Sequence, residues 1–197
     1  FIRALDMFFA KTRNYHMAFK GVGTADGGGS MIFACAKVLR SCGYDICLLM
    51  DSDLQSEDEA KKDLLRSGVP VFDWDSPNAF EEQVFFDVPT DIATEIVNIA
   101  IREHGEGSVK SRLTTGNIPF EERNGKFHLL AMEAEKQKEI GQIAKKRKVE
   151  WYKRIDLGEL LGTVVFENWE RIAAGTKLKE VVNALSKWVI DNDRNGT

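Results

Sequence analysis

The chain has 197 residues, of which 43% are hydrophobic and 29% are charged. This balance fits one substantial folded core, and no apolar run approaches the roughly 20 residues that span a bilayer. The three cysteines form no C-x-x-C pair and the three histidines are scattered, which disfavours a zinc site and predicts reduced thiols in a cytoplasmic protein. Any metal bound here is expected to be a hard cation held by carboxylates.

The net charge of -4 hides two opposite concentrations of charge. Acidic residues gather between positions 51 and 91. The segment 136–154 carries eight Lys or Arg residues against two Glu residues, a net charge of +6. A metal-dependent enzyme that acts on a polyanion needs both kinds of surface. A solvated helix face explains the basic segment equally well.

The first part of the chain alternates between helical and strand patterns. In chain order, the expected elements are a helix at 1–12, a strand at 17–23, a helix at 31–43, a strand at 44–50, a helix at 57–67 and a strand at 69–74. The run YDICLLM at 44–50 is apolar apart from Asp45, as expected for a strand buried on both faces of a parallel sheet. The alternation predicts an α/β fold, with a parallel sheet flanked by helices.

After Pro77 the pattern becomes mostly helical. The expected helices lie at 80–86, 91–105, 128–148 and 177–190, with a glycine-punctuated, loop-rich connection at 105–116 and a further helical stretch from Trp151. The predicted organisation is therefore an α/β core at 1–104, followed by a mostly helical part at 105–197 that comprises an insertion and the C-terminal helices.

Acidic residues follow the predicted strand 44–50. Asp51 and Asp53 stand at its carboxyl end, where parallel sheets place their functional groups. Two carboxylates at this spacing can face one Mg²⁺ ion, although D-x-D also occurs in plain turns and in phosphatases. Glu81 and Glu82 add carboxylates that a two-metal site would need. They equally fit an ordinary helix N-terminus, where acids interact well with the helix dipole.

The turn ADGGGS precedes the helix at 31–43. It lacks the Gly-Lys-Ser/Thr ending of a P-loop and does not fit G-x-G-x-x-G. Ser30, at a helix start after bare glycines, can hold an anion. The plainer interpretation is a tight turn from strand to helix.

Four stretches together resemble the Toprim domain of the OLD (overcoming lysogenization defect) family of nucleases. In order, they are GVGTADGGGS, LRSCGYDICLLMDSD, GVPVFDWDSPNAFEEQVFFDVP and EWYKRIDLGELLG. The resemblance covers most of the chain. It implies a Toprim-like parallel sheet and a DNA endonuclease that depends on Mg²⁺ or Mn²⁺, with relatives in antiphage defence. It also implies a homo-oligomer, no membrane partner, and an upstream ABC-type ATPase domain where ATP would bind.

The resemblance assigns roles to particular residues. Asp51 and Asp53 match the metal-binding D-x-D of the family, and Glu81, with Glu82 as second choice, matches a further acidic ligand. Lys153 matches a lysine that the family places near the scissile phosphate.

The Gly-rich turn also has a counterpart in the family. Asp26, Gly28 and Ser30 match it, as phosphate contacts or as supports of the metal ligands. The family's first glutamate, in a stretch similar to CEGKTE, is expected in a strand just before Phe1. The chain as given is therefore expected to be a Toprim module without its first strand, and to bind metal and cleave DNA weakly.

Two other functions are compatible with the residues. One is a different D-x-D phosphotransferase or phosphatase, which the Leu54-Gln55 sequence after Asp53 disfavours. The other is a domain that binds DNA or protein without chemistry, through its acidic and basic surfaces.

Overall fold

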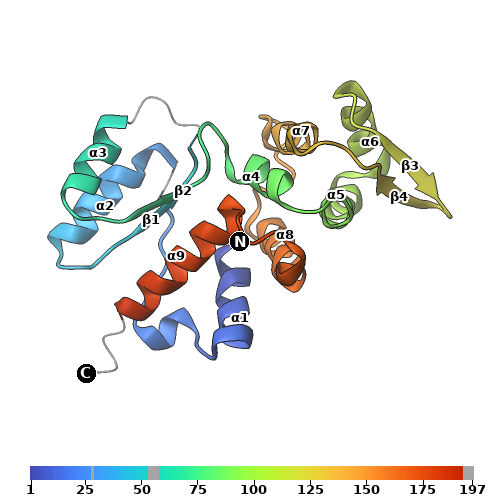
Figure 1. Cartoon of the computed structure of the whole chain (residues 1–197). Coiled ribbons are helices and arrows are strands. Elements are labelled where there is room, and N and C mark those ends of the chain that lie inside the picture. The colour runs from blue at the N-terminus through green and yellow to red at the C-terminus, as the bar shows by residue number, and fades with distance from the viewer. Residues whose placement is uncertain (28, 53–57, 193–197) are drawn as a thin grey trace.

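The computed structural model describes residues 1–27, 29–52 and 58–192 (Figure 1). Within these ranges none of the helices is long and apolar enough to cross a membrane. In chain order the elements are α1 (Ile2–Arg13), η1 (Met17–Lys20), η2 (Gly29–Met31), α2 (Ile32–Ser41), β1 (Leu48–Met50), α3 (Asp58–Arg66), β2 (Val71–Asp73), α4 (Phe80–Asp87), α5 (Thr90–His104), α6 (Glu106–Thr115), β3 (Phe120–Arg123), β4 (Lys126–Leu129), α7 (Ala134–Lys145), α8 (Ile155–Glu167), η4 (Trp169–Arg171) and α9 (Lys177–Asp191).

The predicted α/β class is confirmed by a small parallel sheet with helices on both sides. β1 and β2 pair in parallel, with Leu48 opposite Val71 and Met50 opposite Asp73. Side chains alternate along a strand, so β1 contributes to two cores. Leu48 and Met50 pack with α2 and α3, whereas Leu49 faces the main core. In Figure 1, α2 and α3 lie on one side of the sheet and α9 on the other.

The predicted strand at 17–23 is wrong. Met17–Lys20 form a 3₁₀ turn, which ends at Gly21 in the left-handed region with φ 73°. The cause is a side chain on α1, because the Asp6 carboxylate accepts a hydrogen bond from the backbone N–H of Met17 at 2.7 Å. A backbone donor used in this way is lost to a sheet. Within the described residues, the parallel sheet therefore has two strands and not three.

The predicted helix at 128–148 is also wrong at its start, and the loop-rich connection at 105–116 is largely the helix α6. Strands β3 and β4 form an antiparallel hairpin whose turn is Asn124-Gly125, both with positive φ. Asn-Gly is the usual sequence of such two-residue turns, because both positions require the left-handed region. α7 starts only at Ala134 and ends at Lys145.

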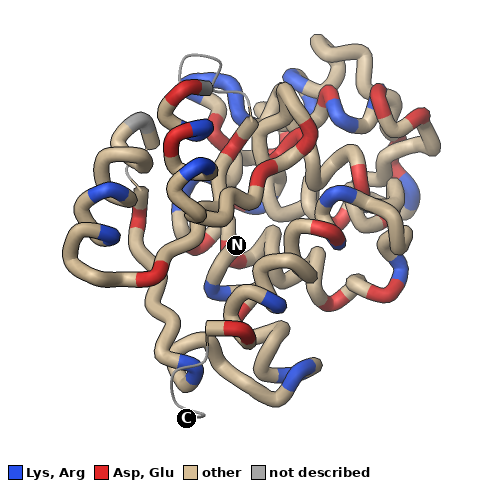
Figure 2. Tube along the Cα trace, turned by 60° about the vertical axis from the view of Figure 1, so that its left-hand side comes forward, with Lys and Arg blue, Asp and Glu red and all other residues tan. Residues whose placement is uncertain are grey.

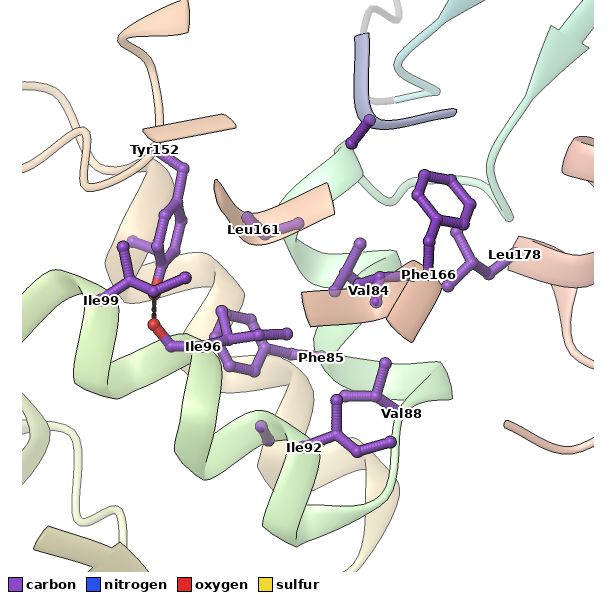
Figure 3. Packing of buried hydrophobic residues seen from close by; sticks show 14 of the residues in the cluster. Val84, Phe85, Val88, Ile92, Ile96, Ile99, Tyr152, Leu161, Phe166 and Leu178 are labelled. Carbon is purple, nitrogen blue, oxygen red and sulfur yellow. Dashed lines mark hydrogen bonds between the residues drawn. The ribbon is translucent and has the colours of Figure 1, made fainter. Parts of the chain in front are cut away.

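One large core joins both halves of the chain. Figure 3 shows side chains of α4 and α5 packed against Tyr152 and against residues of α8 and α9. The Tyr152 hydroxyl donates a hydrogen bond to the backbone carbonyl of Ile96 at 2.9 Å. The predicted boundary between residues 104 and 105 therefore does not coincide with a break in packing.

A glycine sets the closest helix approach near the start of α4. A Cβ atom added at Gly141 of α7 would lie 2.6 Å from the carbonyl oxygen of Glu81 and from the N and Cα atoms of Glu82. Backbone atoms cannot give way as a flexible side chain can. Gly141 thus allows α7 to lie directly against the first turn of α4.

We expect Gly141→Ala to lower the free energy of unfolding by about 1–3 kcal/mol, the usual cost of overpacking. Gly107→Ala is the matched control, because a Cβ atom on Gly107 in α6 would meet nothing within 4 Å. There, loss of chain entropy in the unfolded state should raise stability by about 0.5–1 kcal/mol. Urea unfolding measures both changes. Equal effects of the two substitutions would contradict the close α4–α7 approach.

Candidate active site

Asp51 lies directly after β1, where hydrogen bonds tie it to the start of α4. Its Oδ1 atom accepts a hydrogen bond from the backbone N–H of Phe80 at 2.8 Å. The next residue, Ser52, donates its hydroxyl to the carbonyl of Trp74 at 2.6 Å and its backbone N–H to the carbonyl of Asn78 at 3.0 Å. The loop after β1 is thus held to the segment between β2 and α4.

Glu81 lies in the first turn of α4, half-buried. Burial is the largest cause that raises the pKa of Glu81 above its ordinary value, and the negative charges of Asp51 and Glu82 raise it further. A backbone hydrogen bond and the Lys145 ammonium lower this pKa, but they do not cancel the increase. The helix dipole favours a carboxylate at this position, so burial and the neighbouring acids together outweigh a favourable location. When Glu81 is ionised, the fold does not fully offset its negative charge.

Glu82 has a different environment from its neighbour. Its side chain is buried, and Oε2 accepts hydrogen bonds from the backbone N–H of Ala79 at 2.8 Å and from Nζ of Lys145 at 2.6 Å. The first bond satisfies a donor at the start of α4, and the second joins α4 to the end of α7. Glu82, predicted as the second choice of metal ligand, is thus engaged in holding the two helices together.

Lys145 and Tyr152 complete the surroundings of these acids, and sequence analysis did not single them out. Lys145 comes within reach because Gly141, one helical turn earlier, allows the close approach of α7. Tyr152 is buried, and burial together with the charge of Glu81 raises its pKa well above the ordinary value. Lys145 stands in the basic segment, but its pairing with an acid 63 positions away has no local sequence signal.

Other predicted residues lie apart from this cluster or outside the described part of the chain. Asp53, Gly28 and the side chain of Ser30 lie outside the described part. Asp26 lines a cavity of about 260 Å³ beside α2 and β1, whose lining includes neither Asp51 nor Glu81.

Lys153 lies on the surface between α7 and α8. Its side chain is 73% exposed, and its ammonium pairs with Glu150 at 2.6 Å. The structure thus brings Lys145, and not Lys153, into contact with the acids at the start of α4.

The acids at this site fit a hard cation in part. Asp51 and Glu81 are carboxylates at the carboxyl edge of a parallel sheet, and their charges repel each other. In the described ranges, no group of three or more His, Cys, Asp or Glu side chains is arranged to hold a metal ion. Asp53, the second acid of the D-x-D, is not within those ranges.

Comparisons with protein-family models, with curated proteins and with solved structures find no match to this chain. Function is therefore inferred from the residues and their geometry.

The adjacent residues Glu81 and Glu82 should respond oppositely to substitution by Gln. Because the pKa of Glu81 is raised in the folded state, the unfolded chain loses this proton first as the pH rises. Ionised Glu81 therefore lowers stability at neutral pH. We expect Glu81→Gln to raise the unfolding temperature there, and the gain to vanish below the ordinary Glu pKa of about 4.3.

Glu82→Gln should instead lower stability by about 2–3 kcal/mol, because the charged hydrogen bond between the buried Glu82 carboxylate and Lys145 is lost. Thermal unfolding of both variants over a pH series measures these effects. A loss of stability at neutral pH in Glu81→Gln would show that the Glu81 charge is favourable in the fold.

Proposed function

We propose that this chain is a Toprim-like module that hydrolyses DNA phosphodiester bonds with the help of Mg²⁺ or Mn²⁺. One observation carries the proposal. Asp51 follows a buried parallel strand directly, and its charge acts on Glu81 in the first turn of the helix that also holds Asp51. Carboxylates gathered at the carboxyl edge of a parallel sheet are typical of a functional site.

The burial of Glu81 beside other acids supports a cation as the missing partner. An acid whose pKa is raised by burial, and further by neighbouring carboxylates, costs stability when ionised, and a bound divalent cation offsets this cost. Asp51 and Glu81 would hold the metal, together with Asp53 from the D-x-D. Glu82 would support them from its ion pair with Lys145. When bound, the metal would supply an activated water and stabilise negative charge on the phosphate.

The protein's own groups would fix the geometry around a reacting phosphate. The Phe80 N–H orients the Asp51 carboxylate through Oδ1, and the ion pair of Glu82 with Lys145 fixes the first turn of α4. In hydrolysis, a water oxygen bonds to phosphorus and gives up a proton, the bond from phosphorus to the leaving oxygen breaks, and the leaving oxygen takes up a proton. Rigid placement of acids contributes to such a reaction by avoiding reorganisation in the transition state.

The remaining parts of the proposal rest on the resemblance alone. They are an upstream ABC-type ATPase domain in the same protein, a homo-oligomeric assembly, a cytoplasmic location and a role in antiphage defence. The role of Lys153 near the scissile phosphate also rests on the resemblance. An exposed ion pair such as that between Lys153 and Glu150 is weak, so it does not hold the lysine away from a substrate.

A cleavage assay on supercoiled plasmid tests the proposal. We expect nicking with Mn²⁺ or Mg²⁺ and none with EDTA. Asp51→Asn and Glu81→Gln should each lower the rate by about a hundredfold or more while the fold is kept. Glu95→Gln is the control, because Glu95 is exposed on α5. Calorimetry should show Mn²⁺ binding that an Asp51→Asn, Asp53→Asn double variant loses.

Several outcomes would contradict the proposal. Unchanged Mn²⁺ binding in the double variant would remove the metal site from these acids. DNA binding without cleavage, even with the predicted upstream strand restored, would favour a non-catalytic domain. Hydrolysis of a phosphomonoester but not of DNA would favour a phosphatase. For Lys153, equal small effects of Lys153→Ala and Lys146→Ala at saturating DNA would exclude an active-site role.

A further inference from the structure

Most of the basic segment 136–154 is neutralised by ion pairs, but one part of it is not. Five of its eight Lys or Arg residues pair with carboxylates; these are Lys136, Lys138, Lys145, Lys153 and Arg154. Figure 2 shows Lys and Arg positions interspersed with Asp and Glu positions over the whole trace. Lys146, Arg147 and Lys148 have no carboxylate within ion-pairing distance in the described part of the chain. The positive charge of the segment is therefore concentrated in this turn after α7.

A fourth cation faces the same region from α6. Arg112 likewise pairs with no carboxylate among the described residues. Arg112 and Lys146 line one cavity of about 410 Å³ between α6 and the end of α7, which we call the α6–α7 groove. Its other polar side chains are hydroxyls and none is acidic; the complete lining is Ser108, Ser111, Arg112, Thr115, Gly116, Ile143, Lys146 and Val149.

Two local features shape the groove. A Cβ atom on Gly116 would lie 2.7 Å from Cδ1 of Ile143, so this glycine lets the end of α6 lie close to α7. The end of α6 exposes carbonyls that would repel an anion. Lys136 donates to the Gly116 carbonyl at 3.1 Å and so offsets part of that negative charge. These contacts leave a surface on which cations and hydroxyl groups dominate.

We infer that the α6–α7 groove, extended by Arg147 and Lys148, binds the phosphodiester backbone of DNA at a site separate from the acids. Arg, Lys, Ser and Thr are the side chains that contact phosphate oxygens in protein–DNA complexes. The inference rests on the proposed function only for the identity of the polyanion.

Exposure of the cations favours a polymer over a single free anion. Arg112 and Lys146 are both exposed, and one exposed charge contact contributes little free energy in water. A polyanion gains affinity from several such contacts at once, because each neutralised phosphate releases counterions. The four cations thus fit a run of successive phosphates.

The end of α7 connects the groove to the acids through the chain. Lys145 contacts Glu82, while the next residue, Lys146, lines the groove. The candidate active site and the groove therefore each receive one of two successive lysines.

Fluorescence anisotropy with a labelled DNA duplex in EDTA tests the groove without cleavage. We expect an Arg112→Gln, Lys146→Gln double variant to bind about tenfold or more weakly at moderate salt, and its slope of log K against log salt to fall by about 2. The control is a Lys11→Gln, Lys187→Gln double variant. It removes the same charge from α1 and α9, which lie away from α6 and α7 (Figure 1).

Lys148 provides a second variant that separates binding from folding. Its φ of 73° lies in the left-handed region, which is strained for a lysine. Lys148→Gly should therefore keep or raise the unfolding temperature while it weakens DNA binding. Lys148→Arg should keep the affinity, because it keeps the charge.

Each alternative result has a definite meaning. Equal losses of DNA affinity in the groove variant and in the Lys11, Lys187 control would contradict the groove as the DNA-binding site. They would indicate that binding depends only on overall positive charge. If the chain cleaves DNA and the groove variant binds DNA as tightly as the unchanged chain, the groove inference is wrong but the proposed function stands. If the unchanged chain does not bind DNA, the groove inference and the proposed function are both wrong. Competition by inorganic phosphate, beyond that of chloride at equal ionic strength, would assign the groove to a free anion.

Discussion

The close contact of α7 with the first turn of α4 is the constraint on which the candidate site depends. Gly141 brings the backbones together, and the ion pair of Glu82 with Lys145 joins the two helices across that contact. The start of α4 is in turn the place where the Phe80 N–H binds Asp51 after β1. The sheet edge, the helix start and the basic segment are thus connected through a few short contacts. A shift of α7 would act directly on Glu81 and Glu82 in the first turn of α4.

Two adjacent glutamates have opposite environments in this arrangement. Glu82 is buried and satisfied by a backbone donor and a lysine. Burial, and then the neighbouring carboxylates, raise the pKa of Glu81, so its charge is unfavourable in the folded chain. A residue that weakens the fold without an evident structural gain is typical of a functional site. This contrast makes Glu81 the stronger candidate for a metal ligand.

Sequence patterns predicted what depends on local periodicity and turns. The helices α1, α4, α5 and α9 and the parallel pair of β1 and β2 lie close to their expected positions, and Gly43 and Gly68 follow their helices with positive φ. Such patterns do not predict contacts between residues that lie far apart in the sequence. Asp6 captures the N–H of Met17 and prevents a strand there, and Lys145 reaches an acid on another helix. The hairpin of β3 and β4 had a local signal in Asn124-Gly125 that a helical interpretation of the segment overlooked.

A direct measurement of the Glu81 carboxyl pKa tests the central claim. The claim is that Asp51 and Glu81 form an acid cluster that binds a divalent cation. Carbon-13 NMR of the Glu side-chain carboxyl groups, with Glu81 assigned by loss of its signal in Glu81→Gln, would follow the titration with and without Mg²⁺. The account predicts a pKa above the ordinary value of about 4.3 without metal, and a clear decrease when Mg²⁺ is added. An ordinary pKa that Mg²⁺ does not change would contradict it.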